Sequence, residues 1–193
     1  MQPVLSILIC SIQSRIGMLG CLLRNLDEQI ERNNARGVIE VLIELDNKER
    51  STGLKRQSLL DRSSGKRIVF VDDDDELYDC YIEEMIKASE SEADCFAING
   101  LMTTNGKNPI HWRISKDHEN VTVFDGGNKM YLRHTNHISP VRREIALQAG
   151  FPDKSNAEDG WYSNRLKGLL TSEYLIEKPV YHYKFSTLNK EYK

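Results

Sequence analysis

Four consecutive aspartates, Asp72 to Asp75, followed by Glu76, are the residues of this sequence with the clearest capacity for chemistry. They come directly after the segment 67–71, which reads RIVFV. Like charges this close repel, and one pair roughly 6 Å apart costs about 3 kcal/mol at an effective dielectric of about 20. We therefore expect a cation, a ligand or solvent to offset the repulsion within this acidic row.

The oxygen chemistry of the acidic row suits a divalent cation. Mg²⁺ and Mn²⁺ accept carboxylate and phosphate oxygens together, so an ion held here could also grip the diphosphate of a nucleotide. The ion would stabilise negative charge on a departing diphosphate as a Lewis acid. The alternative is a solvated surface turn, but the apolar run at 67–71 should deliver these carboxylates to the edge of a sheet.

Alternating strands and helices are expected to position the acidic row. Apolar, β-branched runs predict strands, whereas apolar residues three and four apart predict helices. In the first half this pattern predicts strands at 4–10, 38–45, 67–71 and 94–100, and helices at 14–33, 54–65 and 78–91. This alternation predicts an α/β fold with a mostly parallel, Rossmann-like central sheet and helices on both faces.

The second half, 102–193, is less regular and predicts a smaller mixed sheet. Strands are expected at 109–114, 121–124, 172–177 and 180–183, a turn at Gly126-Gly127, and helices at 140–149 and 158–170. No boundary is visible between the halves, so 1–193 is predicted to form a single domain.

Polar residues follow three strands of the predicted sheet. Ser11 follows the first, Asp46 the second, and the acidic row the third. Ligands of open parallel sheets bind outside the carboxyl ends of the strands, and these three ends are expected side by side. A nucleotide could lie across them, with its base near Asp46 and its phosphates near the aspartates.

Other motifs that end a strand in aspartates fit less well. A Walker B strand requires a GxxxxGK[ST] loop elsewhere, and the sequence has none. A calcium-binding EF-hand loop starting at Asp72 would need glycine where Leu77 stands. A haloacid-dehalogenase-type phosphatase has DxD on its first strand, with threonine or valine where this sequence has Glu76.

Bulk composition excludes several classes of protein. The formal net charge is -3 over 193 residues, which favours neither nucleic acid nor a membrane surface as a partner. No apolar run approaches the roughly 20 residues of a membrane-spanning helix. The four cysteines lack CxxC spacing and predict free thiols in a reducing compartment, so we expect a cytoplasmic protein, or one in the host cytoplasm if the source is a virus.

The stretch "GLKRQSLLDRSSGKRIVFVDDDDEL" and the later "NAEDGWYSNRL" resemble a nucleotide-sugar glycosyltransferase of the GT-A fold, most closely family 2. The family pattern is a glycine, Lys-Arg-Asn, a leucine pair, Gly-Lys, an apolar strand and then DxDD. Gln57 stands where asparagine is common. The resemblance covers about residues 4 to 185, and it implies that 1–101 binds the nucleotide sugar and 102–193 faces the acceptor.

The resemblance implies roles for residues of the first half. Asp46 is similar to the aspartate that hydrogen-bonds the uracil edge, and Arg56 to a basic residue near the nucleotide or donor sugar. Asp72 resembles the first carboxylate of DxD, near the ribose and sugar. Asp74 resembles the metal-binding carboxylate, assisted by Asp75. Four consecutive aspartates leave the register of the DxD motif open by one residue. Asp73 is therefore a candidate nucleotide-binding residue together with Asp72.

The second half supplies the candidate catalytic residues. "AEDG" resembles the family's ED motif, which implies that Asp159 is the general base taking a proton from the acceptor hydroxyl and that Glu158 orients the site. The alternative is that these acids only stabilise a helix N-terminus. His182 resembles a late histidine that completes the metal shell, although a histidine between tyrosines is more often simply packed. For sugar stacking, Trp161 is favoured over Trp112, which is expected in the core.

The resemblance thus predicts a glycosyltransferase dependent on Mn²⁺ or Mg²⁺. It would move a sugar from a nucleoside diphosphate, expected to be UDP, to a glycan or another hydroxyl acceptor with inversion, and further domains of a larger transferase are expected partners. Two alternatives remain open. One is a nucleotidyltransferase-like enzyme, although the segment 10–20 lacks a convincing phosphate loop, and the other is a non-catalytic nucleotide- or sugar-binding module.

Overall fold

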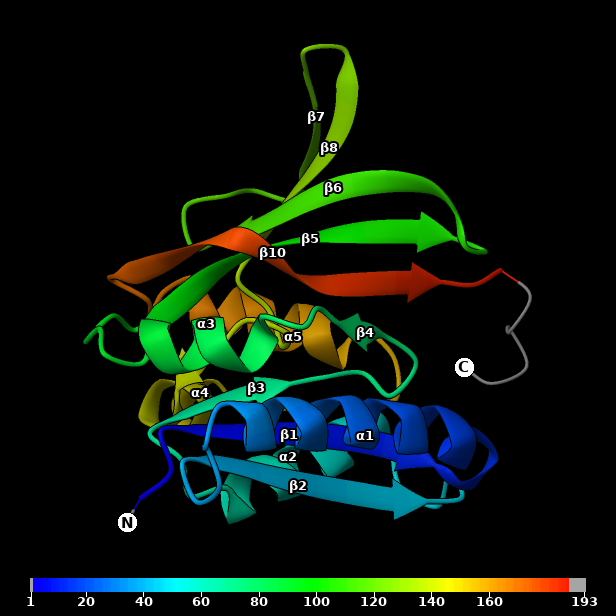
Figure 1. Ribbon diagram of the computed structural model, residues 1–193, viewed down its shortest axis with the longest axis vertical. Helices are drawn as coiled ribbons and strands as arrows, with labels where there is room; N and C mark the ends of the chain where they lie inside the picture. Colours follow the sequence, from blue (N-terminus) through cyan, green and yellow to red (C-terminus); the bar gives the residue numbers. More distant parts are fainter. Residues whose placement is uncertain (1, 188–193) are drawn as a thin grey trace.

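The computed structural model describes residues 2–187. Within them, ten strands form one continuous sheet, whose main path runs β2-β1-β3-β9-β5-β6-β8-β7 and to which β10 and β4 add through β5 (Figure 1). The predicted division of the chain into two halves after residue 101 falls inside β5 (Cys95–Thr104). This strand pairs with β6, β9 and β10, so the two halves share one strand of the sheet.

The first three long strands are parallel and neighbouring. β1 (Leu5–Ile12) lies between β2 (Ile39–Asp46) and β3 (Arg67–Phe70), and its register aligns Ile12 with Asp46. Parallel pairing brings the carboxyl ends of the three strands to the same edge of the sheet. The expected juxtaposition of the three polar strand ends is therefore present.

Helices cover both faces of the sheet, because the strand residues are apolar on both sides. On one face, α1 (Ile16–Arg32) and α3 (Tyr81–Ala88) pack against Ile7 and Ile9 in one buried cluster. On the other, α2 (Thr52–Arg62), α4 (Arg143–Ala149) and α5 (Glu158–Leu166) pack against Leu8, Ile68 and Phe70. The α/β class, the mostly parallel central sheet and the two helical layers are thus confirmed.

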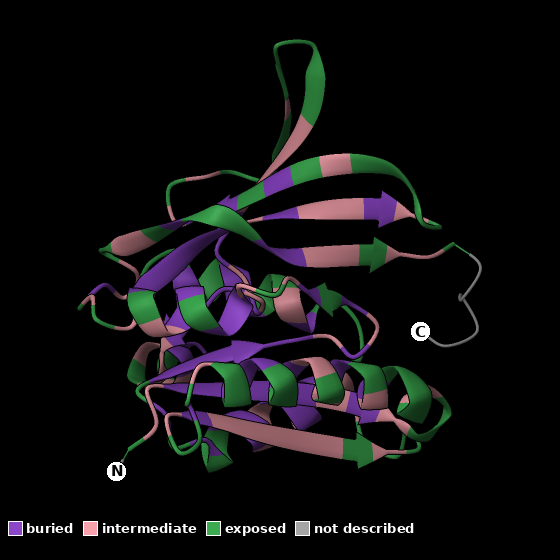
Figure 2. Ribbon diagram, in the orientation of Figure 1, coloured by how far each residue is buried: buried purple, intermediate pink, exposed green. Residues whose placement is uncertain are grey.

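The second half extends the sheet with mixed pairings. β6 (Lys107–Ser115) runs antiparallel to β5, and β8 (Asn128–His134) lies parallel to β6 and antiparallel to β7 (Val121–Asp125). Figure 1 shows the β7–β8 hairpin projecting from the body of the molecule, and Figure 2 shows its tip exposed. Phe124, on this hairpin, is 73% exposed.

Several predicted boundaries were wrong. The two late strands expected at 172–177 and 180–183 are one strand, β10 (Glu173–Phe185), because irregular register around Pro179 lets pairing with β5 continue past the proline. The helix expected from 140 begins only at Arg143, after the short strand β9 (Val141–Arg142). β8 was not foreseen, and the short strand β4 (Glu76–Leu77) was missed because it pairs only with distant β10.

The predicted helices are generally shorter than the periodic pattern suggested. The helix expected at 14–33 starts as a 3₁₀ turn, Gln13–Arg15, and the one expected at 54–65 ends at Arg62. Helix ends fray or tighten in ways that periodicity does not reveal. None of the helices within residues 2–187 is long and apolar enough to cross a membrane.

Candidate active site

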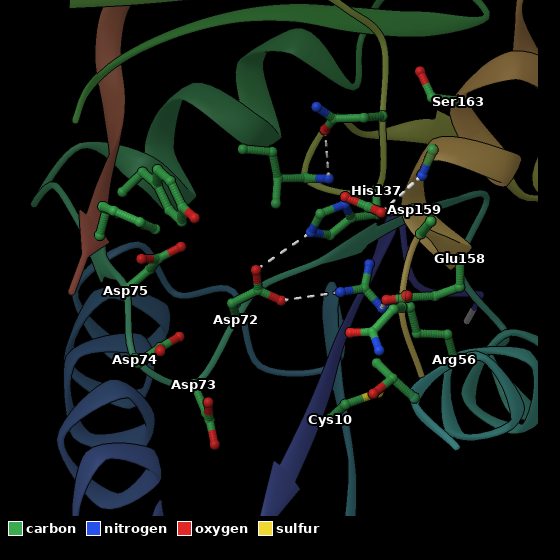
Figure 3. Close-up of a pocket in the computed structure, with 18 of the residues that line it drawn as sticks. Cys10, Arg56, Asp72, Asp73, Asp74, Asp75, His137, Glu158, Asp159 and Ser163 are labelled. Carbon is green, nitrogen blue, oxygen red and sulfur yellow. Dashed lines mark hydrogen bonds and ion pairs between the residues drawn. The ribbon is translucent and has the colours of Figure 1, made fainter. Parts of the chain in front are cut away.

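A cavity of about 1030 Å³ opens at the carboxyl ends of β1 and β3, where α5 and the end of β10 face them (Figure 3). Seven of the nine predicted site residues line it: Arg56, Asp72, Asp73, Asp74, Asp75, Glu158 and Asp159. Asp46 and His182 do not line it. The cavity therefore joins residues from both halves of the sequence.

Asp72 is held between two side chains from opposite parts of the chain. Arg56 Nη2 on α2 donates to Oδ1 at 3.3 Å, and His137 Nε2 lies 3.3 Å from Oδ2, as Figure 3 shows. Burial alone would raise the pKa of Asp72, but the adjacent His137 and Arg56 hold that pKa well below its usual range. Asp72 is therefore ionised at neutral pH, with its carboxylate oriented by two contacts.

Asp73 turns away from Asp72 toward the start of the chain. Ser11 Oγ donates to Asp73 Oδ2 at 2.6 Å, and Arg15 Nη1 donates to Oδ1 at 2.8 Å. The Asp73 side chain is only 2% exposed. Both of its oxygens thus have protein partners.

Asp74 and Asp75 are the less well neutralised pair of the row. Burial raises the pKa of Asp74, Arg15 opposes this, and Asp72 raises the pKa again. The pKa of Asp75 is raised well above its usual value by burial and by the charge of Asp72, despite hydrogen bonds from the Lys184 N–H at 2.8 Å and the Tyr181 hydroxyl at 2.8 Å. An added cation would relieve this part of the site.

Arg56 is a buried cation at the boundary between the aspartates and α5. Its guanidinium lies 5.3 Å from the ring centre of Phe70 and 5.8 Å from that of Phe151, and Nε is 3.6 Å from Glu158 Oε1. Nε and Nη1 are buried, and neither has a hydrogen-bond partner within the part of the chain that the structure describes. A ligand oxygen in the cavity could satisfy these donors.

The acids of α5 lie in its first turn and not at its N-cap. The N-cap is Ala157, in the left-handed region with φ of 61° and with no side-chain cap. Glu158 is buried toward Arg56, whereas Asp159 is half-buried and accepts a hydrogen bond from the Gly160 N–H at 2.8 Å. Acidic side chains in the first turn stabilise a helix through its dipole, so stabilising the helix and facing a ligand are compatible roles.

Asp46 accepts hydrogen bonds from neighbouring protein groups in this structure. Lys55 Nζ donates to its Oδ1 at 2.6 Å, and the backbone N–H groups of Lys48 and Arg50 donate to its two oxygens at 3.2 and 3.0 Å. Burial opposes the effect, but these hydrogen bonds lower the pKa of Asp46. The residues it organises, Lys48, Arg50 and Lys55, do line the cavity.

His182 lies away from the aspartates. Its Nε2 is 3.0 Å from Thr103 Oγ1 and its Nδ1 is 3.2 Å from Glu76 Oε2. Successive side chains of a strand point to opposite faces, and Tyr183, the next residue of β10, lines the cavity. The structure thus places His182 beside Glu76 and not in the cavity with the four aspartates. The histidine beside the row is His137, to which sequence reasoning assigned no firm role.

Trp112 lies in the core as expected, but Trp161 does not lie at the cavity wall. Trp161 is 47% exposed, does not line the cavity, and has Lys154 Nζ 5.8 Å from its ring centre. Trp112 is 6% exposed and packs on Tyr181, as expected for the core, yet its edge also reaches the cavity beside Tyr131. A tryptophan two residues after Asp159 faces outward because α5 turns roughly 200° over two residues.

The acidic row fits a divalent ion that shares its coordination with a ligand. Within residues 2–187, no three His, Cys, Asp or Glu side chains form a cluster that could cage a metal. Mg²⁺ is usually held by one or two carboxylates, with substrate phosphates and waters completing its shell. Asp74, whose side chain is 32% exposed in the cavity, supplies such a carboxylate beside the under-neutralised Asp75.

Two residues of the site had no strong sequence signal. Arg15 bridges Asp73 and Asp74 from the turn before α1, and His137 reaches Asp72 from the loop before β9. Neither residue was assigned a role in the site from the sequence. A hint for Arg15 was available, since it follows the first strand by a few residues, at the edge where ligands of parallel sheets bind.

The fold and cavity define a Rossmann-like α/β domain with an acid-rich site at the strand ends. No protein-family model matches the chain. No curated protein sequence matches it either.

Among solved structures, the chain is similar to TarS of S. aureus. Its fragment 1–349 superposes with a TM-score of 0.62 at 14% identity over 93% of this chain and 60% of that one. The same fragment in complex with UDP-GlcNAc gives 0.61 at 13% identity over 93% and 58%, and in complex with UDP 0.64 at 14% over 94% and 60%. The chain thus spans about 60% of the TarS fragment, and at this identity the likeness concerns the fold.

Proposed function

We propose that this chain is a nucleotide-sugar glycosyltransferase that uses a UDP-sugar as donor. The supporting observation is that Asp159 and the four aspartates line one cavity. In the similar fold of TarS, the solved complexes contain UDP and UDP-GlcNAc. Family 2 membership, inversion and metal dependence are parts of the proposal that rest on the sequence resemblance and on the chemistry of these residues.

The donor's diphosphate lies at the edge formed by β1 and β3. Arg15, Lys55 and Arg56 are cationic residues that line this part of the cavity and offset phosphate charge. Its nucleoside lies toward Lys48 and Arg50, which Asp46 holds in place. A divalent ion at Asp74, with Asp75 beside it, supplies Lewis-acid stabilisation of the departing diphosphate when bound.

The chemical step is a single displacement with Asp159 as base. An acceptor oxygen forms a bond to the anomeric carbon, the bond from that carbon to the diphosphate oxygen breaks, and its electron pair leaves with UDP. Asp159 takes the proton of the acceptor hydroxyl. Glu158 positions Arg56 through their ion pair. One displacement at the anomeric carbon inverts its configuration.

The acceptor enters from the side of the cavity that strands of the second half of the sheet line. That side is lined by Met102, Trp112, Ile114 and Tyr131 from β5, β6 and β8. Apolar and aromatic side chains of this kind suit the apolar face of a sugar ring, so a glycan is the acceptor class we favour over other hydroxyl compounds. The chain covers only part of the TarS length, and further domains that help to hold the acceptor belong to the proposal.

The decisive test compares Asp159→Asn with Asp74→Asn. Removing the base should reduce sugar transfer, or hydrolysis of UDP-GlcNAc or UDP-glucose by water, by about 10²–10⁴-fold while UDP binding with Mn²⁺ is retained. Asp74→Asn should instead weaken the Mn²⁺-dependent part of UDP binding. Calorimetry measures binding, and released UDP measures turnover.

Asp125→Asn, at the exposed end of β7, is the control and should behave as the unmodified protein. Full activity in Asp159→Asn would remove that residue as the base. Binding of UDP without turnover of any donor would favour a binding module, and turnover of a nucleoside triphosphate would favour nucleotidyl transfer.

A further inference from the structure

Arg15 forms an asymmetric bridge across the acidic row. Its Nη1 is 2.8 Å from Asp73 Oδ1 and its Nη2 is 3.2 Å from Asp74 Oδ2. The Asp73 end is the fixed one, because that side chain is 2% exposed and also accepts from Ser11 Oγ at 2.6 Å. The Asp74 end is longer and faces the cavity, with Asp74 32% exposed.

A guanidinium and a divalent ion cannot share Asp74 without repulsion. An ion that binds this carboxylate alone lies beside Nη2 of Arg15, and the repulsion between the two positive charges weakens the contact between Arg15 and Asp74. A diphosphate in the cavity changes this balance, because its oxygens can accept from Nη2 while they also bind the ion.

We propose that Arg15 is a positioning residue that holds Asp74 in the ligand-free protein and transfers its Nη2 to the donor's diphosphate when the divalent ion binds. This inference rests on the proposed function. Arg15 remains anchored to Asp73 throughout, so the planar guanidinium pivots about its Nη1 contact and Nη2 turns away from Asp74. The consequence is that donor and ion bind cooperatively: each is weak alone and strengthens the other.

The charge of the row agrees with such an exchange. Arg15 contributes one positive charge that Asp73 and Asp74 share, so two carboxylates have a single monovalent partner here. A divalent ion supplies the second positive charge that the two carboxylates lack. Once the ion is bound, the charge of Arg15 is in excess, and the diphosphate neutralises it. Reciprocity requires that the ion strengthen diphosphate binding by the same factor as the diphosphate strengthens ion binding.

The test is a four-state binding cycle that does not depend on turnover. Free Mn²⁺ is quantified by electron paramagnetic resonance, with and without UDP, for the unmodified protein and for Arg15→Gln. In the unmodified protein, UDP should tighten Mn²⁺ binding by about 5–150-fold, the usual range of coupling between sites. In Arg15→Gln, Mn²⁺ alone should bind more tightly, and the factor contributed by UDP should be smaller than in the unmodified protein, because only the direct contact between the ion and the diphosphate remains.

Loss of the cation beside buried Asp73 could unfold Arg15→Gln, so a second variant is needed. Arg15→Lys keeps a positive charge for Asp73 but lacks the planar fork that spans two carboxylates. It should fold, bind Mn²⁺ alone more tightly than the unmodified protein and show reduced coupling. Arg24→Gln, on the exposed face of α1, is the matched control and should leave both affinities unchanged.

Two results would overturn the inference in distinguishable ways. If the folded variants of Arg15 bind Mn²⁺ and UDP with the affinities and coupling of the unmodified protein, the arginine exchange is wrong and the proposed function stands. If the unmodified protein and every variant bind neither UDP nor Mn²⁺, the proposed function itself fails, and the inference fails with it.

Discussion

Asp75 is the residue whose charge state differs most from what its position in an acidic run suggests. Both of its oxygens accept hydrogen bonds from β10, one from the Tyr181 hydroxyl and one from the Lys184 N–H. Burial and the charge of Asp72 nevertheless raise its pKa well above the ordinary value. Four adjacent aspartates therefore do not act as four equivalent carboxylates, since Asp72 is stabilised as an anion and Asp75 is not.

We expect Asp75→Asn to stabilise the ligand-free protein at neutral pH. With a native pKa above the unfolded value of about 3.9, Asp75 costs no stability below that pH. The cost grows as the pH rises toward the native pKa, because the unfolded chain releases a proton that the native state retains. Asparagine cannot ionise and should raise Tm by about 2–4 °C for each kcal/mol recovered.

Thermal unfolding without metal at pH 3.5 and pH 7.5 checks this expectation. The gain should be present at pH 7.5 and absent at pH 3.5. Asp79→Asn, an exposed neighbour, serves as the control. An equal gain at both pH values would mean that packing and not ionisation is responsible.

At the scale of elements, the start of α2 determines where Lys55 and Arg56 lie. Ser51 caps this helix by accepting from the Leu54 N–H at 3.1 Å, and the Gly53 N–H donates to the Lys154 carbonyl at 2.8 Å. The second contact ties α2 to the loop that leads into α5. This one close contact between two backbone segments thus positions the basic residues of α2 relative to the acids of α5.

We expect Gly53→Ala to destabilise the protein and weaken UDP binding. An added Cβ would overlap the carbonyl oxygen of Pro152 and lie 2.9 Å from that of Lys154, so the helix start must shift. Overpacking of this kind costs about 1–3 kcal/mol. Chemical unfolding measures the effect.

The matched control for this substitution is Gly20→Ala, within α1. An added Cβ at Gly20 meets nothing within 4 Å, so alanine should stabilise that helix by about 0.5–1 kcal/mol. A stabilising effect at both positions would show that the approach of α2 to the loop at 152–154 is not tight.

At the scale of the whole molecule, β10 connects the acidic row to the second half of the sheet. The Tyr181 hydroxyl donates to Asp75 Oδ2 and accepts from the Asp72 N–H at 3.3 Å, and Tyr181 is fully buried. Trp112 on β6 packs against the same ring. The donor side and the acceptor side of the cavity are therefore joined through one side chain.

Tyr181→Phe should lower the free energy of unfolding by about 1–3 kcal/mol, because it leaves buried polar groups of Asp72 and Asp75 without a partner. It should also weaken UDP binding, since both aspartates line the cavity. Tyr81→Phe is the control, because the buried Tyr81 hydroxyl has no hydrogen-bond partner within the described residues.

Removing the Tyr81 hydroxyl should be neutral or stabilising, since a buried unsatisfied polar group is unfavourable. Urea unfolding of both variants, together with calorimetry with UDP, makes the comparison. Equal losses from the two substitutions would contradict the connecting role of Tyr181.

Much of the fold was predictable because its signals are local. The apolar runs at 4–10, 38–45 and 67–71 form neighbouring parallel strands, and the helical periodicity between them produced helices on both faces. β8 and the continuous β10 were not predictable in this way. β8 was missed although it pairs with β7, its neighbour across the turn at Gly126-Gly127. The partners of β10 are distant in sequence, and Pro179 inside β10 ordinarily indicates a strand end.

The sequence alone determined that a row of carboxylates follows a buried strand at the edge where ligands bind, because strand order and strand ends follow from local pattern. Only the tertiary structure decided how each carboxylate is neutralised. Arg15, His137 and Tyr181 reach Asp73, Asp72 and Asp75 from three separate segments. Such partnerships depend on distance in space, which residue spacing along one chain does not encode.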